Sequence, residues 1–152
     1  MSRPATYDHV QRGRFHLLLH ALALLVIVVA WQVGPGFVPL AAGLATGAVF
    51  ELLALCFQQL RVADQRDHLL IAFGPLPLFR RRVRYAEMVS ASVSRSSFLE
   101  GWGIHWVPFK GWIWNLQGRD CVRIQLSDTR QLTVGTDDPS GLGAFLQARI
   151  IA

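Results

Sequence analysis

The side chains that could do chemistry in this chain are few, and their spacing matches no catalytic or metal-binding pattern. Its five histidines, at positions 9, 16, 20, 68 and 105, lack the spacing of zinc ligands. The sequence has no glycine-rich phosphate loop, no C-x-x-C pair and no H-E-x-x-H motif. The serines between Ser90 and Ser97 have no base in an evident pairing position. We therefore expect a protein that is not an enzyme, with no catalytic residue, no metal and no cofactor.

Two side chains remain of interest because they lie in strongly apolar sequence. Glu51 lies roughly nine residues from the inner end of its apolar run, and His20 lies about six residues inside the other run. A bare carboxylate in hydrocarbon is costly, so Glu51 must be protonated, paired or directed into a polar cavity. Their depths differ by about 6 Å along the helix axis, which helix tilt and two long side chains bridge. We expect a structural His20–Glu51 pair, and the alternative is a proton or ion path.

The elements that position this pair are two apolar runs near the start of the chain. Between residues 15 and 60 no lysine or arginine occurs, although the 152-residue chain has 15 of them. A helix over residues 15–33 is about 28 Å long, close to the thickness of the hydrocarbon core. Gly34-Pro35-Gly36 separates it from a second run, 37–57, so the chain must return to its starting side. The runs predict a transmembrane helical hairpin over 15–60, and the second one argues against a cleaved signal peptide.

The basic residues predict the orientation of this hairpin. Three arginines precede it and two, Arg61 and Arg66, follow it, whereas residues 34–39 carry no positive charge. Segments rich in lysine and arginine stay on the cytoplasmic side of a membrane. We therefore expect residues 1–14 to form a cytoplasmic N-terminal segment, and both termini to lie in the cytoplasm.

The second run contains a G-x-x-x-G spacing, formed by Gly43 and Gly47. This spacing places both glycines on one helix face and lets another backbone approach closely. The face packs either against the first span or against another chain.

After Val62 the apolar residues alternate with polar ones, which is typical of half-buried strands. The expected strands cover residues 69–73, 78–85, 88–94, 112–116, 121–126 and 131–135. Asp138 and Pro139 open a final helix, since Asp is a good N-cap and Pro is tolerated at the first helical position. We expect an antiparallel sheet or partial barrel, capped by a C-terminal amphipathic helix, in a cytoplasmic domain over 61–152.

Five segments of this domain form an ordered set. They are residues 67–74 (DHLLIAFG), 83–91 (VRYAEMVSA), 101–104 (GWGI), 122–126 (VRIQL) and 134–139 (VGTDDP) with the helix that follows. In this order they resemble the bacterial PH-like (pleckstrin-homology-like) domains, over about residues 62–150. The resemblance implies a bent antiparallel sheet with a C-terminal capping helix, and it implies no reaction. With the hairpin, it implies an α+β, multi-pass protein of the bacterial cytoplasmic (inner) membrane.

A first candidate surface is basic. Arg80, Arg82 and Arg84 share one strand face, opposite Phe79 and Val83. Contact with anionic headgroups is worth about 1 kcal/mol per basic residue near the surface, and a solvated strand face is the alternative. The candidate headgroup contacts are Arg61, Arg66, Arg80, Arg82, Arg84 and Lys110. Nucleic acid is not expected despite the pI of about 10.2, because only one aromatic side chain, Tyr85, lies beside the arginines.

A second candidate surface is aromatic. Four of the five tryptophans lie within fourteen residues. Trp112 and Trp114 share a strand face, so we assign them to the core or to a groove for a partner. Trp102, Trp106 and Phe109 lie near glycines and a proline, in an expected loop. That loop either rests at the level of the headgroups or forms a hot spot for another membrane protein.

Together these features predict a membrane-anchored, non-catalytic binding module. The first interpretation is a protein-interaction or assembly factor for a membrane complex, with a membrane-protein partner or a homo-oligomer. The alternative is an anionic-lipid-binding or lipid-sensing module. A third interpretation is a small transporter or channel subunit built on His20 and Glu51. The expected partners are therefore the lipid bilayer and a membrane protein.

Overall fold

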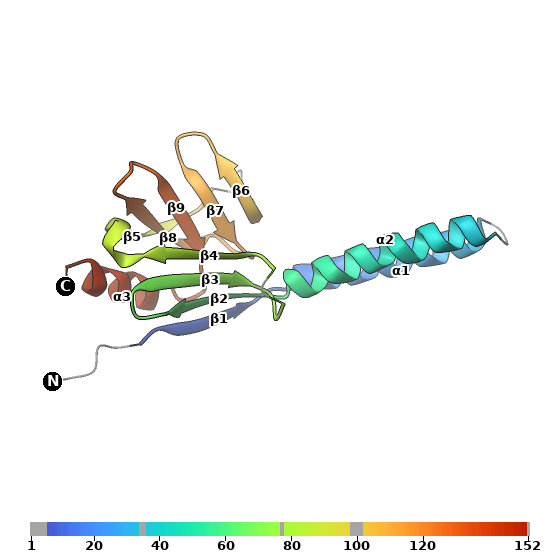
Figure 1. The fold of residues 1–152 in the computed structure, drawn as a ribbon, viewed down its shortest axis with the longest axis horizontal. Helices are drawn as coiled ribbons and strands as arrows, with labels where there is room; N and C mark the ends of the chain where they lie inside the picture. Colours follow the sequence, from blue (N-terminus) through green and yellow to red (C-terminus); the bar gives the residue numbers. More distant parts are fainter. Residues whose placement is uncertain (1–5, 34–35, 77, 98–101, 152) are drawn as a thin grey trace.

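The chain folds into a pair of long helices joined to a domain of two β-sheets (Figure 1). The computed structural model describes residues 6–33, 36–76, 78–97 and 102–151. Some residues used above lie outside these ranges: Arg3, one of the three arginines before the hairpin, Gly34 and Pro35 of the connecting loop, and Gly101 of the segment GWGI.

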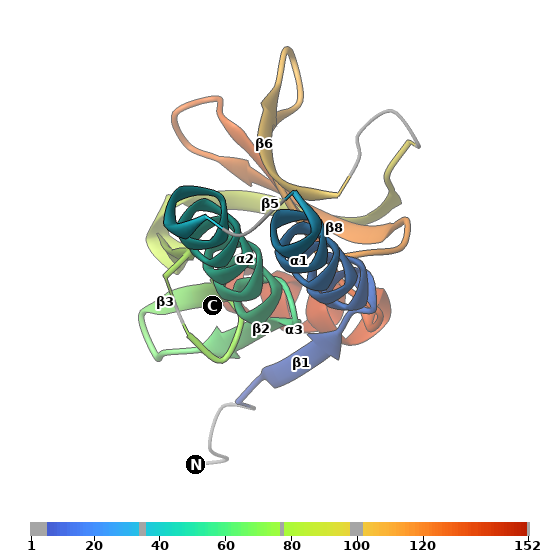
Figure 2. The same ribbon diagram turned by 90° about the vertical axis from the view of Figure 1, so that its right-hand side faces the viewer.

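The two helices are α1 (Phe15–Gln32) and α2 (Phe37–Cys56), and they pack against each other along their length (Figure 2). Each ends within one residue of the expected spans 15–33 and 37–57. Both are long enough and apolar enough to cross a membrane, judged by length and composition.

The helix pair is inserted between two neighbouring strands, β1 (Asp8–Arg12) and β2 (Gln59–Asp64). These strands are antiparallel, with Arg12 opposite Gln59, and the Gly13 N–H donates to the Gln58 carbonyl at 3.1 Å. Residues 1–14 are therefore not a separate segment, as expected, because β1 belongs to the sheet domain, which was expected to begin at residue 61. The pattern missed β1 because its inward-facing side chain Gln11 is polar and its outward-facing Val10 is apolar.

The first sheet, sheet A, has the strand order β1-β2-β3-β4 and is antiparallel throughout. Its remaining strands are β3 (His68–Phe73) and β4 (Arg80–Arg84). Leu69, Ile71 and Phe73 are fully buried on its inner face, as period-two alternation predicts. The same alternation leaves Arg80 and Arg82 exposed on the outer face.

The second sheet, sheet B, has the order β5-β8-β9-β7-β6. Its strands β7 and β9 are parallel, so this sheet is mixed, which corrects the expectation of an antiparallel sheet. A short helical turn, η1 (Tyr85–Glu87), leads into it, and its strands are β5 (Met88–Arg95), β6 (Gly103–Val107), β7 (Gly111–Asn115), β8 (Asp120–Leu126) and β9 (Gln131–Gly135). The strand β6 corrects the expectation of a loop from Trp102 to Phe109. The glycines in this segment suggested a loop. Gly103 and Gly111 instead have positive φ angles and are the first residues of β6 and β7, respectively.

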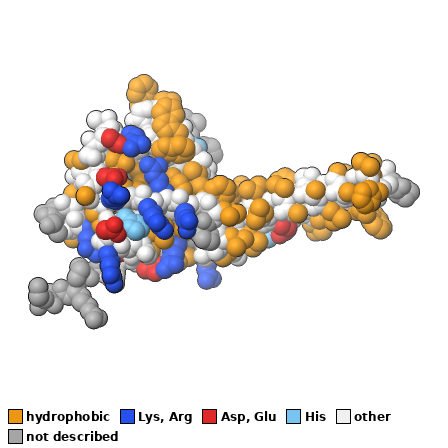
Figure 3. All heavy atoms as spheres, viewed as in Figure 1, with side chains coloured by type: hydrophobic (Ala, Val, Ile, Leu, Met, Phe, Trp, Pro, Cys, Tyr) orange, Lys and Arg blue, Asp and Glu red, His pale blue; other side chains and the backbone are white. Residues whose placement is uncertain are grey.

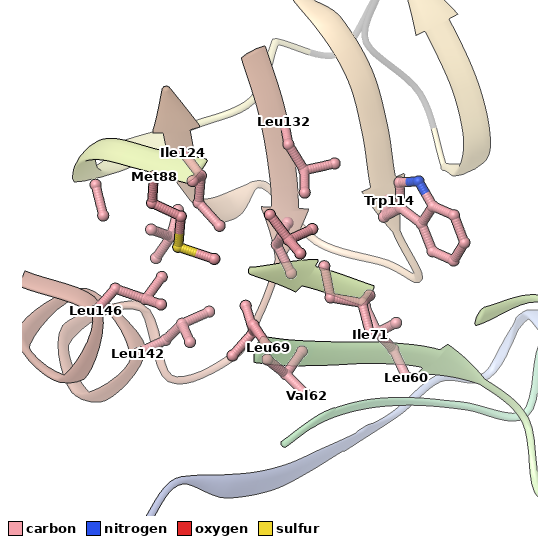
Figure 4. Close-up of a cluster of buried hydrophobic side chains, with 14 of the residues drawn as sticks. Leu60, Val62, Leu69, Ile71, Met88, Trp114, Ile124, Leu132, Leu142 and Leu146 are labelled. Carbon is pink, nitrogen blue, oxygen red and sulfur yellow. The ribbon is translucent and has the colours of Figure 1, made fainter. Parts of the chain in front are cut away.

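The core lies between the two sheets and is closed by α3 (Pro139–Ile151), the predicted C-terminal helix. Leu69 and Ile71 of sheet A face Ile124 and Leu132 of sheet B, with Leu142 and Leu146 of α3 filling one end (Figure 4). The Asp138 side chain accepts a hydrogen bond from the Gly141 N–H at 3.0 Å, which confirms the predicted N-cap. The protein is therefore α+β, with two apolar helices near its N-terminus, two sheets and a final helix.

Candidate functional site

A basic groove lies on the outer face of sheet A, beside the base of the helix pair. Arg61, Arg80 and Arg82 line it together with Gly74 and Pro75, around a hollow of about 240 Å³. Strand register explains the clustering, because Ala72 of β3 is opposite Arg61 on one side and Arg80 on the other. Figure 3 shows basic side chains gathered on this face next to the apolar helices. We call the hollow lined by Arg61, Arg80 and Arg82 the arginine groove.

The arginine groove is held directly against the end of α2. Gly74 has a φ of +74°, and a Cβ at this position would lie 2.6 Å from the Leu55 carbonyl oxygen. Its N–H donates to the Gln59 carbonyl at 2.7 Å. Only glycine fits such a close approach, so the turn after β3 is fixed to the last turn of α2.

The charge of the groove is partly neutralised. Arg61 donates two hydrogen bonds to Asp8, at 2.9 and 2.6 Å, and this contact holds the pKa of Asp8 below its usual range. In the part of the chain that the structure describes, neither Arg80 nor Arg82 has an acidic partner. Arg82 also borders the neighbouring hollow that contains Asp67 and Glu87. The groove therefore presents two guanidinium groups that form no ion pair within the described residues, which suits a phosphate or carboxylate.

The other predicted headgroup contacts do not belong to this groove. Arg66 lies in the turn between β2 and β3, at the end of the strands farther from the helices, rather than just after the second span. Arg84 is opposite His68 at that same end and shares a hollow of mixed charge with Asp67 and Glu87. Lys110 lies in the turn between β6 and β7 of the other sheet. Sequence position alone does not reveal on which end of a strand a charge lies.

The β6–β7 hairpin carries the exposed aromatic residues. Trp106 is opposite Trp112 on one face, and both remain substantially exposed, while Phe109 in the turn is fully exposed. Trp114 belongs to the same face but is buried, with its ring 5.8 Å from that of Phe73. This face of the hairpin is therefore buried at Trp114 and exposed farther out. We call its exposed part, formed by Trp106, Phe109 and Trp112, the aromatic ledge. Figure 1 shows this hairpin projecting from the domain across the direction of the helix pair, with β6 on the side of sheet B nearer the helices.

Trp102 is separate from the aromatic ledge. Its ring centroid lies 6.3 Å from that of Phe15, the first residue of α1. The three aromatic residues that were predicted to act together therefore occupy two places. Trp102 lies at the base of the helices, and Trp106 and Phe109 lie on the projecting hairpin.

The structure brings His20 and Glu51 together, with His20 Nδ1 2.8 Å from Glu51 Oε2. The expected difference in depth disappears, because α2 ends at Cys56 and both residues are five positions from a helix end. Gly43 and Gly47 are buried against α1, where added Cβ atoms would meet Ala30 and Ile27. The G-x-x-x-G face therefore packs the hairpin against itself.

A buried charged network that the sequence analysis missed joins sheet A to α3. Asp64 Oδ2 lies 2.6 Å from an Arg149 nitrogen, and Tyr85 donates its hydroxyl hydrogen to Asp64 Oδ1 at 2.9 Å. Burial, followed by this contact with Asp64, raises the pKa of Tyr85 above its usual range. The three residues are far apart in the chain, and no local pattern marks them as partners. Their part is structural, because the Asp64 side chain is almost fully buried.

Comparison with known proteins adds no relative to this description. No protein-family model matches the chain, and no curated protein matches it. In the described ranges, no three histidine, cysteine, aspartate or glutamate side chains are grouped so that they could hold a metal ion. The arginine groove, the aromatic ledge and the His20–Glu51 pair are therefore the features from which a function has to be argued.

Proposed function

We propose that this chain is a two-span protein of the bacterial cytoplasmic membrane, with both termini and the sheet domain in the cytoplasm. The length and composition of α1 and α2 support this proposal. So do the large apolar side chains exposed on the helix surfaces, such as Leu17, Leu24 and Val49, which water would solvate poorly. The arginines at the base of the pair support a cytoplasmic location for that end.

Reporter fusions test this topology. A reporter that is active only outside the cytoplasm should work when inserted at residues 34–36 and fail at the C-terminus, because the two spans return the chain to its starting side. A reporter active only in the cytoplasm is the matched control and should give the reverse result. Activity of the first reporter at the C-terminus would overturn the two-span topology and the cytoplasmic domain.

We also propose that the sheet domain is PH-like. A four-stranded antiparallel sheet faces a second sheet, and α3 closes the core between them, in keeping with the fold that the resemblance implies. The parallel pairing of β7 with β9 departs from the antiparallel sheet that the resemblance implies.

The function that the geometry supports best is a non-catalytic module that binds a protein partner of the membrane. The aromatic ledge carries this proposal, since it exposes Trp106, Phe109 and Trp112 on a hairpin that projects from the domain. Tryptophan and other aromatic side chains are enriched at the centres of protein interfaces.

Changes on the aromatic ledge should release this partner. Trp106→Ser combined with Phe109→Ser should weaken the complex at least about tenfold, because both side chains lose their burial in the partner. The measurement is affinity purification of the full chain in mild detergent, followed by the stoichiometry of the co-purified protein. Val89→Ser, which removes an exposed apolar side chain from β5, is the control and should leave the complex intact. An unaffected complex in the double variant would exclude the ledge as the interface.

A second candidate function, binding of anionic lipid headgroups, is favoured by the arginine groove. The groove is fixed to the last turn of α2, so in a membrane-inserted chain it lies near the headgroups. Two arginines without an acidic partner and a hollow of about 240 Å³ suit a phosphate group.

Reversing charge in the arginine groove should weaken this lipid binding. Arg80→Glu with Arg82→Glu should remove about 2 kcal/mol of headgroup attraction, roughly thirtyfold, and high salt should abolish the difference. Native mass spectrometry would count phosphatidylglycerol and phosphatidylcholine retained by the full chain. The control is Arg66→Glu with Arg95→Glu, which changes the net charge equally at distant positions. Equal lipid retention by both double variants would show that the arginine groove is a solvated surface that does not bind headgroups.

A further inference from the structure

The His20–Glu51 pair is only partly covered by the helix pair that carries it. The side chains are 39% and 48% exposed, respectively, although each lies five residues inside its helix. At 1.5 Å per residue that position is about 7.5 Å from the helix ends, and so within the hydrocarbon of an inserted hairpin. Figure 3 shows red acidic atoms on the helix pair, whose surface in this view is mostly apolar. A polar pair exposed to lipid is costly, so another polar surface should cover it.

The proton balance of the pair defines what that surface must offer. Hydrocarbon favours a net neutral pair, in which His20 and Glu51 share one proton along the 2.8 Å contact. Whether this proton resides on Nδ1 or on the carboxyl group, His20 Nε2 carries a hydrogen and Glu51 Oε1 keeps free lone pairs. The pair therefore presents one donor and one acceptor, and within the described residues neither has a further hydrogen-bond partner.

The glycine face of the hairpin is not available to a partner. Gly43 and Gly47 are buried against α1, with Ala30 and Ile27 filling the space beside them. A helix that binds this hairpin must therefore use another face. Leu24 and Leu55 lie one turn from His20 and Glu51, respectively, and are exposed beside the pair.

We propose that this face binds a second copy of the chain within the membrane. Two copies inserted with the same topology are related by a two-fold axis along the membrane normal, so their polar pairs lie at the same depth. His20 Nε2–H of each copy then donates to Glu51 Oε1 of the other, and all four groups are satisfied without a free charge. An unrelated helix would need a donor and an acceptor at this depth by coincidence. The inference rests on the membrane insertion proposed above, which the reporter fusions test separately.

The mass of the full chain in lipid nanodiscs or mild detergent tests this inference. We expect a dimer for the unchanged chain, and at least a tenfold higher dissociation constant for Glu51→Leu, which removes the acceptor. Glu51→Gln keeps an acceptor oxygen and should retain most of the dimer. Thr46→Leu is the matched control, because it removes an exposed polar group from α2 on a different face and should have no effect.

Cross-linking gives a second measurement, in which the His20–Glu51 pair is left unchanged. Leu24→Cys should be joined between copies by a short bis-maleimide, whereas Thr46→Cys should not. The native Cys56 and Cys121 are buried and give little background. A monomeric unchanged chain, equal dimerisation of Glu51→Leu, or equal cross-linking at both positions would overturn the proposal. Loss of the ledge partner in the Trp106 and Phe109 double variant should leave this dimer intact, so the two proposals fail independently.

Discussion

Replacing Asp64 with alanine should lower the free energy of unfolding of the sheet domain by about 3–5 kcal/mol. Asp64 is nearly fully buried and accepts hydrogen bonds from Tyr85 and Arg149, at 2.9 and 2.6 Å. Its removal leaves the guanidinium group of Arg149, which is itself largely buried, without an anion. The same change detaches α3 from sheet A, because Arg149 is the helix's charged contact with β2.

Urea unfolding of the full chain in mild detergent, followed by tryptophan fluorescence, measures this effect, since Trp114 lies in the core. Asp67→Ala is the matched control: Asp67 is only three residues away but mostly exposed, and its side chain pairs with His68 at the surface. It should change the free energy of unfolding by less than about 0.5 kcal/mol. If Asp64→Ala and Asp67→Ala had the same free energy of unfolding, the buried contacts of Asp64 would stabilise the domain no more than the surface pair of Asp67 with His68.

Replacing Gly111 with alanine should cost about 2–5 kcal/mol and detach the aromatic ledge from the core. Gly111 begins β7 with a φ of +73°, and a Cβ there would overlap the Gln131 carbonyl oxygen of β9. Because the obstacle is backbone, β7 must move away from its parallel partner β9. We therefore expect the same variant to lose the partner that binds the ledge.

Gly118→Ala separates backbone strain from this collision. Gly118 has a similar φ of +86°, but a Cβ there would have no neighbour within 4 Å. It should cost only about 1 kcal/mol, the strain of a left-handed residue. Hydrogen exchange of the β7 amides, together with the urea midpoint, distinguishes the two variants. Similar losses at both positions would mean that the β7–β9 contact is not rigid.

The sequence by itself determined the elements whose signals are local. The helices α1 and α2 follow from two long apolar runs separated by glycine and proline, and each ends within one residue of its expected span. Alternation of apolar residues predicted β3, β5, β8 and β9, because one face of each strand is buried in the core. Asp138 and Pro139 likewise predicted the start of α3. Length, alternation and capping are properties of neighbouring residues, so one sequence suffices to read them.

The tertiary structure alone decided which residues meet across the chain. The strand β1 was missed because its buried side chain is the polar Gln11, which only its pairing with β2 explains. Strand register separated Arg66 and Arg84 from the arginine groove. The expected loop from Trp102 to Phe109 proved to contain β6, which begins at Gly103 with a positive φ angle. The sequence predicted the His20–Glu51 pair, which the structure confirms, but the equal depth of the two residues followed from the end of α2 at Cys56, where the chain turns into β2. Each of these features depends on pairing between segments distant in sequence, whose free energy comes from the assembled sheets and core rather than from any local run of residues.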